Sequence, residues 1–135
     1  MKEKVLFLCT HNSARSQMAE ALLRALKGDR YESFSAGTLP GKLNPYVVRA
    51  MAEMGVDLSS HYAKSLNQFL HDDFDYIVTV CDHAQESCPY FPGGRKKIHQ
   101  SFADPSSFTG TDDEIMEGVR RVRDEIKEWI MTAFK

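Results

Sequence analysis

Blocks of apolar residues along this chain predict strands and helices in alternation. Residues 5–9 are all apolar, which is typical of a strand buried on both faces. From residue 16 to 26 the apolar positions recur three and four residues apart, as on a helix with one buried side, and Gly28 follows as a stop signal. A second strand is predicted at 31–36, where Gly37 ends it.

The second half of the chain continues this alternation. Asn44 supplies a cap, and Pro45 a first-turn proline, for a helix that ends before Gly55. Strands are predicted at 76–81, which is rich in β-branched residues, and at 97–100, which is short. An apolar stripe predicts a final helix over 112–134, and its members are Ile115, Val119, Val122, Ile126, Trp129 and Ala133.

Strands that alternate with helices indicate parallel pairing through right-handed crossovers. The sequence therefore predicts one α/β domain over residues 1–135: a doubly wound, three-layer sandwich around a four-stranded parallel sheet. In such sheets ligands bind beyond the carboxyl ends of the strands. Both Cys9 and Cys81 are expected at that edge.

Composition and charge exclude several classes of protein. The net charge of −2 gives no signal for nucleic acid, and the basic run at 95–97 fits a solvated loop. The first apolar stretch is only five residues long, too short for a signal peptide or a membrane span. We expect a cytoplasmic protein that binds neither nucleic acid nor membranes. Three cysteines in such a chain favour redox or metal chemistry over a structural disulfide.

Candidate chemistry concentrates where the first strand gives way to the first helix. Cys9 ends the strand and Arg15 follows six positions later, so the loop between them aims backbone N–H groups and a helix N-terminus at one point. Arg15 adds a planar fork of donors that matches two oxygens of a tetrahedral anion. We expect these surroundings to lower the pKa of the Cys9 thiol. The predicted oxyanion-binding residues are Thr10, His11, Asn12, Ser13, Ala14 and Arg15.

A structural interpretation of the same residues exists. Cys9 could simply end a buried strand, and Ser16 could simply cap the helix. The position of Arg15 and the switch from strand to helix favour a nucleophile whose sulfur the Ser16 hydroxyl hydrogen-bonds. The chain has no G-x-x-x-x-G-K-[ST] motif, so nucleoside triphosphate binding is unsupported.

Two further cysteines follow the third strand. Cys81 ends that strand, and Cys88 lies seven residues later in a polar segment. In a helix they would lie about 10.5 Å apart, so a disulfide between them requires the helix to melt. A redox relay uses such an arrangement, because a partner thiol must reach the final disulfide. Two alternatives stay open: unrelated cysteines, or a metal site of Cys81, His83 and Cys88, whose spacing lacks the C-x2-C of structural zinc.

Asp104 precedes Pro105 just after the fourth predicted strand. Aspartate before proline is by itself a turn signal. At this place, however, the carboxyl group would overhang the edge of the sheet, where it could protonate a leaving oxygen. In the company of Cys9 and Arg15, the interpretation as a general acid is favoured.

Together these motifs resemble the thioredoxin-coupled arsenate reductases, which share the low-molecular-weight tyrosine phosphatase fold. The similarity runs from residue 4 to about residue 130. The C-x5-R-S motif alone is shared with phosphatases, whereas its combination with the cysteine pair and Asp-Pro is specific. The matching positions are 9–16, 35–37, 44–45 and 104–105, together with Cys81 and Cys88. Some relatives carry a cysteine at the position of Ala14, which the relay does not require.

The resemblance implies a three-cysteine relay that reduces arsenate to arsenite in arsenic detoxification. Cys9 attacks arsenate bound by Arg15, while Asp104 protonates the departing oxygen. Cys81 then attacks the Cys9 sulfur and releases arsenite, and Cys88 attacks Cys81. Thioredoxin reduces the resulting disulfide, although the sequence does not separate it from glutaredoxin or mycoredoxin. The resemblance implies no bound cofactor, and we expect a monomer.

Some of these relatives bind a potassium ion through Asn12, Glu20, Ser35 and an aspartate, whose position here aligns with Lys64. We expect the Lys64 ammonium to replace the ion by pairing with Glu20 and fixing Asn12, and we expect no metal site. The alternative is an ordinary solvated lysine and an ordinary exposed glutamate.

Two other functions fit parts of the pattern. A phosphatase would hydrolyse phosphotyrosine or small phosphoesters through a Cys9 phosphoenzyme, with Asp104 protonating the alcohol. Against it, Ser106 and Ser107 stand where phosphatase relatives place aromatic residues, and hydrolysis does not use the second cysteine pair. A non-catalytic oxyanion or redox sensor would need no acid, and Asp104→Asn would leave it unchanged.

Overall fold

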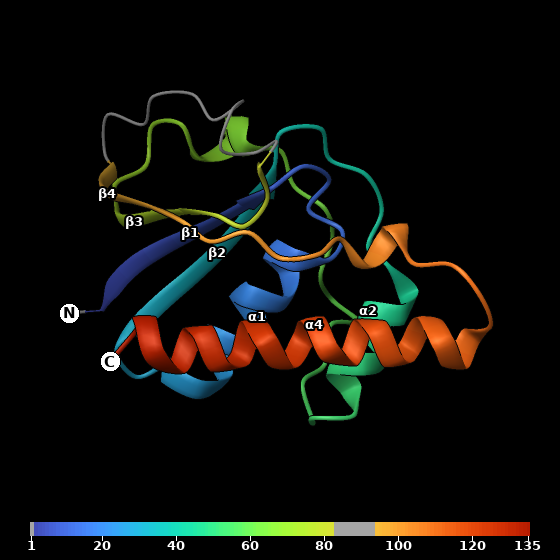
Figure 1. Cartoon of the computed structure of the whole chain (residues 1–135). Helices are drawn as coiled ribbons and strands as arrows, with labels where there is room; N and C mark the ends of the chain where they lie inside the picture. The colour runs from blue at the N-terminus through green and yellow to red at the C-terminus, as the bar shows by residue number, and fades with distance from the viewer. Residues whose placement is uncertain (1, 83–93) are drawn as a thin grey trace.

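A computed structural model describes residues 2–82 and 94–135 of the chain. Four strands form one parallel sheet in the order β2-β1-β3-β4 (Figure 1). They are β1 (Glu3–Cys9), β2 (Tyr31–Gly37), β3 (Phe74–Thr79) and β4 (Gly94–His99). The helices are α1 (Arg15–Lys27), α2 (Pro45–Ala52) and α4 (Asp112–Ala133), with short 3-10 helices η1 (Leu66–Phe69) and η2 (Pro105–Ser107). The predicted α/β fold around a four-stranded parallel sheet is confirmed.

Helices α1, α2 and α4 lie on one side of the sheet, and the segment with η1 lies on the other (Figure 1). Phe69 of η1 contacts the rings of Phe34 and Phe74, which anchor that segment to β2 and β3. β1 is one of the two interior strands, with β2 on one side and β3 on the other, and its residues from Val5 to Cys9 are all buried. Because both faces of the sheet are covered at β1, by the helices on one side and the η1 segment on the other, its residues form a continuous apolar run.

The last helix, α4, begins with a complete capping box. Thr111 caps it, and Glu114 completes a capping box by accepting from the Thr111 backbone N–H. The buried face of α4 consists of Met116, Val119, Val122, Ile126 and Ile130. The predicted stripe is therefore wrong at its end, because Ala133 is exposed and Phe134, just beyond the helix, turns into the core instead.

Two strand predictions need correction. β3 ends at Thr79, so Cys81 lies two residues beyond the strand, although Val80 still donates a hydrogen bond to the Leu8 carbonyl of β1. The strand predicted at 97–100 is β4 at Gly94–His99, so Arg95 and Lys96 of the basic run belong to a strand rather than to a loop. β4 is an edge strand with an exposed face, where charged side chains are tolerated and discourage pairing with other chains.

No helix in the described part of the chain combines the length and apolar character needed to cross a membrane.

Candidate active site

The loop between β1 and α1, residues 10–14, is called the anion loop here because the sequence predicts that it binds an oxyanion, and it wraps around the Cys9 sulfur. Cys9 is buried, with its Sγ 2.8 Å from Ser16 Oγ and accepting the Asn12 N–H at 3.2 Å. Asn12 reaches this position because its backbone is left-handed, with φ of 51°, a conformation that asparagine tolerates. Gly37 makes room for the loop: a Cβ there would lie 2.6 Å from the Thr10 carbonyl oxygen.

The side chain of Asn12 fixes the direction of the hydrogen bond to the sulfur. Its Nδ2 donates to Ser16 Oγ at 2.7 Å, and its Oδ1 accepts the Lys64 backbone N–H at 2.8 Å. Because Ser16 Oγ already accepts from Asn12, its own hydrogen is available for Cys9 Sγ. Ser16 therefore lies within hydrogen-bond distance of the Cys9 sulfur, as the sequence predicted, and it does not cap α1.

The pKa of the Cys9 thiol is raised above its ordinary value, because burial disfavours the thiolate. Hydrogen bonds from Ser16 and the Asn12 N–H, and the charge of Arg15, act in the opposite direction without reversing the shift. The expected lowering of this pKa is therefore wrong for the loop as the structure describes it. Desolvation of the sulfur outweighs its donors.

Arg15 and Asp104 lie beside each other at this edge of the sheet. Arg15 donates to the Phe102 carbonyl at 3.1 Å, and its guanidinium nitrogen is 3.7 Å from Asp104 Oδ2. The other carboxylate oxygen, Oδ1, accepts the Ser106 N–H at 3.0 Å and so caps η2. Asp104 is thus both a turn former and a carboxyl group that faces the anion loop.

The remaining loop residues divide between inward and outward positions. Ser13 and Ala14 are buried, and the Ser13 carbonyl accepts the Asn44 N–H at 2.9 Å. The exposed imidazole of His11 points to the segment after β2, where its Nδ1 donates to the Leu39 carbonyl at 2.8 Å. The side chain of His11 therefore braces the loop from outside.

Cys81 is buried next to the anion loop, and its Sγ lies 3.4 Å from Thr10 Oγ1. The structure thus brings a second thiol beside the residue that follows Cys9. Cys88 and His83, the other members of the predicted relay and of the metal alternative, lie outside the described residues. Within residues 2–82 and 94–135, no group of three His, Cys, Asp or Glu side chains is placed to hold a metal ion.

The four residues of the predicted ion-replacing network lie together behind the loop. Glu20 is buried rather than exposed, accepts from the Ser35 hydroxyl, and lies 3.9 Å from Lys64 Nζ. Burial lowers the pKa of Lys64, while the charge of Glu20 raises it. Contrary to the expectation, the contact between Lys64 and Asn12 is made by the Lys64 backbone N–H, and the ammonium donates to the Tyr62 carbonyl at 3.1 Å.

Two residues of this cluster, Gln17 and His61, were not predicted from the sequence. The buried Gln17 donates from Nε2 to Asn12 Oδ1 at 3.0 Å and to the Tyr62 carbonyl at 2.9 Å. Its Oε1 accepts from Nδ1 of His61 at 3.0 Å, and burial lowers the pKa of that imidazole. The available signal was a glutamine directly after Ser16, on a part of α1 that is otherwise small or apolar.

A second missed group lies beside Cys81. His99, at the end of β4, donates from Nε2 to Asp82 Oδ1 at 2.9 Å, because a carboxylate can only accept. Its Nδ1 is 2.8 Å from the hydroxyl of Thr79, at the end of β3. This chain of contacts joins the ends of β3 and β4 to the residue after Cys81.

Comparison with known proteins places this geometry in a family. Residues 4–133 match the family described as low molecular weight phosphotyrosine protein phosphatase. An arsenate reductase of Halalkalibacterium halodurans is 42% identical over 131 residues, covering 97% of this chain and 94% of the relative. An arsenate reductase solved in the phosphate binding state superposes with a TM-score of 0.83 at 27% identity, covering 97% of this chain and 95% of that one.

A second solved structure is described as thioredoxin-dependent. It is an arsenate reductase of Corynebacterium glutamicum, with a TM-score of 0.63 and 31% identity, covering 98% of this chain and 63% of that one.

Proposed function

This chain belongs to the low molecular weight phosphotyrosine protein phosphatase family, and from that premise we propose that it reduces arsenate to arsenite by a relay of three cysteines. The observation that carries the proposal is the position of Cys81, whose sulfur lies 3.4 Å from Thr10 Oγ1, beside the anion loop. Hydrolysis of a phosphoester would use Cys9, Arg15 and Asp104 but not a second thiol at the same edge. Relatives about 40% identical that are named arsenate reductases support the same choice.

In the first proposed step, the Cys9 thiol passes its proton to an oxygen of the bound arsenate, and the resulting thiolate forms a bond to the arsenic atom. The N–H groups of the loop and the guanidinium of Arg15 bind the oxygens, and Ser16 donates to the attacking sulfur. Asp104 gives its proton to the departing oxygen, which leaves as water. The product is arsenic(V) bound through oxygen atoms and the Cys9 sulfur.

In the second step, the thiolate of Cys81 attacks the Cys9 sulfur. A disulfide forms between the two cysteines, and the electron pair of the broken sulfur–arsenic bond stays on arsenic, which leaves as arsenite. The thiolate is the attacking form, and a hydrogen bond from Thr10 to Cys81 Sγ would favour it.

In the third step, Cys88 attacks Cys81, which frees Cys9 and forms a Cys81–Cys88 disulfide. Since Cys88 lies outside the described residues, this step rests on the resemblance of the sequence. Thioredoxin supplies the two electrons that reduce the disulfide, with glutaredoxin and mycoredoxin as the alternative reductants. We propose that no bound cofactor takes part and that the protein acts in the cytoplasm.

The decisive experiment measures arsenite formation with thioredoxin, thioredoxin reductase and NADPH in the wild type and in three cysteine variants. The wild type should turn over many times, whereas Cys9→Ser and Cys81→Ser should release no arsenite. Cys88→Ser should release about one equivalent per enzyme and then stop, because the first two steps remain possible. Continued turnover by Cys88→Ser would contradict the relay.

A phosphatase is the second candidate, because the same loop and the pairing of Arg15 with Asp104 would serve a phosphoester equally well. Hydrolysis of p-nitrophenyl phosphate without any reduction of arsenate would decide for this alternative.

A further inference from the structure

Asn44 lies where the anion loop, the start of α2 and the loop of Asp104 meet. Its backbone N–H donates to the Ser13 carbonyl of the anion loop at 2.9 Å. Its Oδ1 caps α2 by accepting the Tyr46 N–H at 2.8 Å. Only the amide oxygen can accept the Tyr46 N–H, so the amide nitrogen Nδ2 faces the opposite way. There it donates to Ser106 Oγ at 3.0 Å.

Ser106 in turn holds the carboxyl group of Asp104. The Ser106 backbone N–H donates to Asp104 Oδ1 at 3.0 Å, which leaves Oδ2 as the oxygen that faces Arg15. The buried ring of Pro105 fixes the backbone between the two residues. One continuous chain of contacts therefore runs from the anion loop through Asn44 and Ser106 to the carboxyl group.

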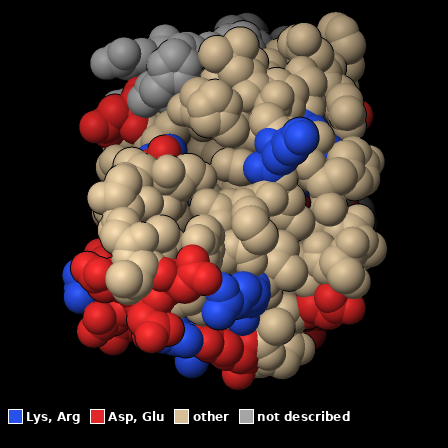
Figure 2. All heavy atoms as spheres, turned by 90° about the vertical axis from the view of Figure 1, so that its right-hand side faces the viewer, with Lys and Arg blue, Asp and Glu red and all other residues tan. Residues whose placement is uncertain are grey.

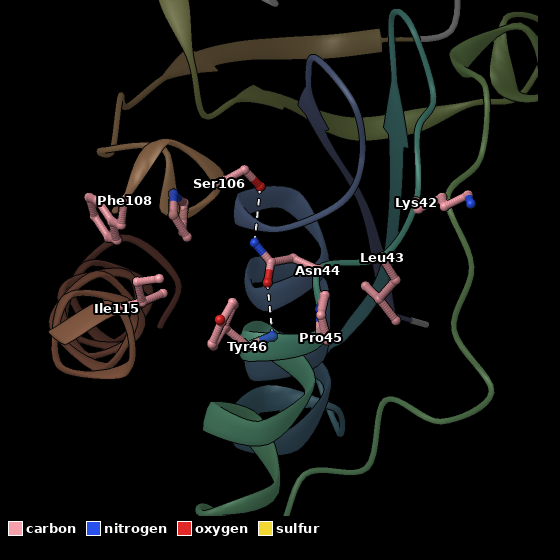
Figure 3. Close-up of a pocket in the computed structure, with 9 residues that line it drawn as sticks. Lys42, Leu43, Asn44, Pro45, Tyr46, Ser106, Phe108 and Ile115 are labelled. Carbon is pink, nitrogen blue, oxygen red and sulfur yellow. Dashed lines mark hydrogen bonds between the residues drawn. The ribbon is translucent and has the colours of Figure 1, made fainter. Parts of the chain in front are cut away.

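Figure 3 shows the Asn44 side chain between Ser106 and Tyr46. These residues line a hollow of about 270 Å³. Lys42, Phe108 and Ile115 also line this hollow, between the start of α2, η2 and α4. Open space beside the bond means that side-chain packing contributes less here to holding the two segments at a fixed separation. The hydrogen bond from Asn44 to Ser106 spans that gap.

We propose that Asn44 is a positioning residue, which acts through Ser106 to hold the Asp104 carboxyl group over the anion bound at Cys9. A general acid transfers its proton only within hydrogen-bond reach of the leaving oxygen, and a displacement of about 1 Å can cost roughly 100-fold in rate. The N-cap residue of α2 thus sets the distance between the Asp104 carboxyl group and the anion loop. This inference rests on the proposed role of Asp104 in arsenate reduction.

The test distinguishes the hydrogen bond from Asn44 to Ser106 from the capping of α2 by Asn44. Asn44→Ser keeps a good N-cap residue but is too short to reach Ser106, and Ser106→Ala removes the bridging hydroxyl while keeping the N–H that binds Asp104. In single-turnover arsenite release, each variant should slow the reaction about tenfold, within the roughly 10²–10⁴-fold that general acid catalysis supplies. The half-saturating arsenate concentration should change less than about twofold, since the anion loop is intact. Ser106→Thr, which keeps a hydroxyl, should retain most of the rate.

The same substitutions are then made in an Asp104→Asn background, where they should cause no further loss. An equal loss in both backgrounds would show that Asn44 merely stabilises the loops and would overturn the proposal, as would an unchanged rate in the wild-type background. Tyr46→Phe is the matched control, because it removes only the 2.7 Å bond between Tyr46 and Asp112 and should leave the rate unchanged.

Phenyl phosphate, whose poor leaving group needs the acid, separates this inference from the proposed function. If arsenate is not reduced but Asn44→Ser and Ser106→Ala slow phenyl phosphate hydrolysis only while Asp104 is present, the reductase proposal fails and the positioning role stands.

Discussion

Asn12 is the residue with the most hydrogen bonds to the surroundings of Cys9 among those the structure describes. It presents its N–H to Cys9, its amide nitrogen to Ser16, and its side-chain oxygen to Gln17 and Lys64. The sequence predicted Asn12 as an oxyanion-binding loop residue and as a residue that Lys64 fixes, but not as the donor to both Cys9 and Ser16. Its central role depends on a left-handed backbone and on Lys64, 52 positions away, and neither is encoded in the local pattern.

At the same scale, the raised pKa of Cys9 predicts a pH dependence. In the Cys81→Ser/Cys88→Ser double variant without bound anion, the alkylation of Cys9 by iodoacetamide should rise with pH to a midpoint above the ordinary value of 9.0. Ser16→Ala should move the midpoint higher still, because the hydrogen bond from Ser16 favours the thiolate. A midpoint well below 9.0 would contradict the dominance of burial.

The sign for stability follows from the same shift. Because the pKa of Cys9 is higher in the folded chain than in the unfolded one, the unfolded chain loses this proton first as pH rises. The contribution of Cys9 to the free energy of unfolding is therefore complete below pH 9 and is lost as pH rises through the folded pKa. Cys9→Ser should therefore lose less stability than the wild type when urea unfolding is compared at pH 8 and pH 10.

The position of Lys64 yields another prediction for a single residue. With its ammonium 3.9 Å from Glu20, the wild type should reduce arsenate at the same rate in sodium and potassium buffers of equal ionic strength. Lys64→Asp should be slower in sodium buffer and should regain part of its rate in potassium buffer, because two carboxylates then need a cation. Clear activation of the wild type by potassium would contradict the replacement.

Between elements, α2 and α4 are joined by an ion-pair network as well as by apolar contacts. Glu53, just after α2, accepts from Arg120 at 2.7 Å and from Arg123 at 3.0 Å on α4. The hydrogen bonds from Arg120 and the nearby charges lower the pKa of Glu53 to about 2. Charged side chains gather on the lower part of the face shown in Figure 2, while most of its middle is uncharged.

Glu53→Gln should be less stable than the wild type at pH 7, since it removes the carboxylate that both arginines bind. A carboxyl group with a lowered pKa stabilises the fold above its ordinary pKa of 4.5, and this contribution is lost as pH falls toward 2. The difference between the two proteins in urea unfolding should therefore shrink between pH 5 and pH 2.5. A difference independent of pH would indicate packing rather than charge.

The elements also show what a local pattern can predict. The strands at 5–9 and 31–36 and the helices after Cys9 and Asn44 were predicted nearly to their ends, because buried periodicity and capping residues are local signals. The true end of β3 and the start of β4 at Gly94 were not predicted. Those depend on how far the neighbouring strands continue to pair, which is set by partners distant in sequence.

At the scale of the whole molecule, the C-terminal end of the chain closes the core. Phe134 is buried and packs edge-on against four rings, those of Phe7, Tyr31, Tyr76 and Trp129. Phe134→Ala should lower the free energy of unfolding by about 3–5 kcal/mol, the usual cost of such a cavity. Urea denaturation measures this loss, and Met131→Ala, at an exposed position of α4, is the control expected to change it little.

The strand order has a consequence for how activity arises during folding. Thr10 meets Cys81 across 71 positions of sequence, and Arg15 meets Phe102 across 87. Contacts between such distant positions close the longest chain loops and tend to form late. A partly synthesised chain would carry Cys9 as an ordinary thiol without its partners. The proposed reactivity toward an oxyanion would therefore arise only once these distant contacts have formed.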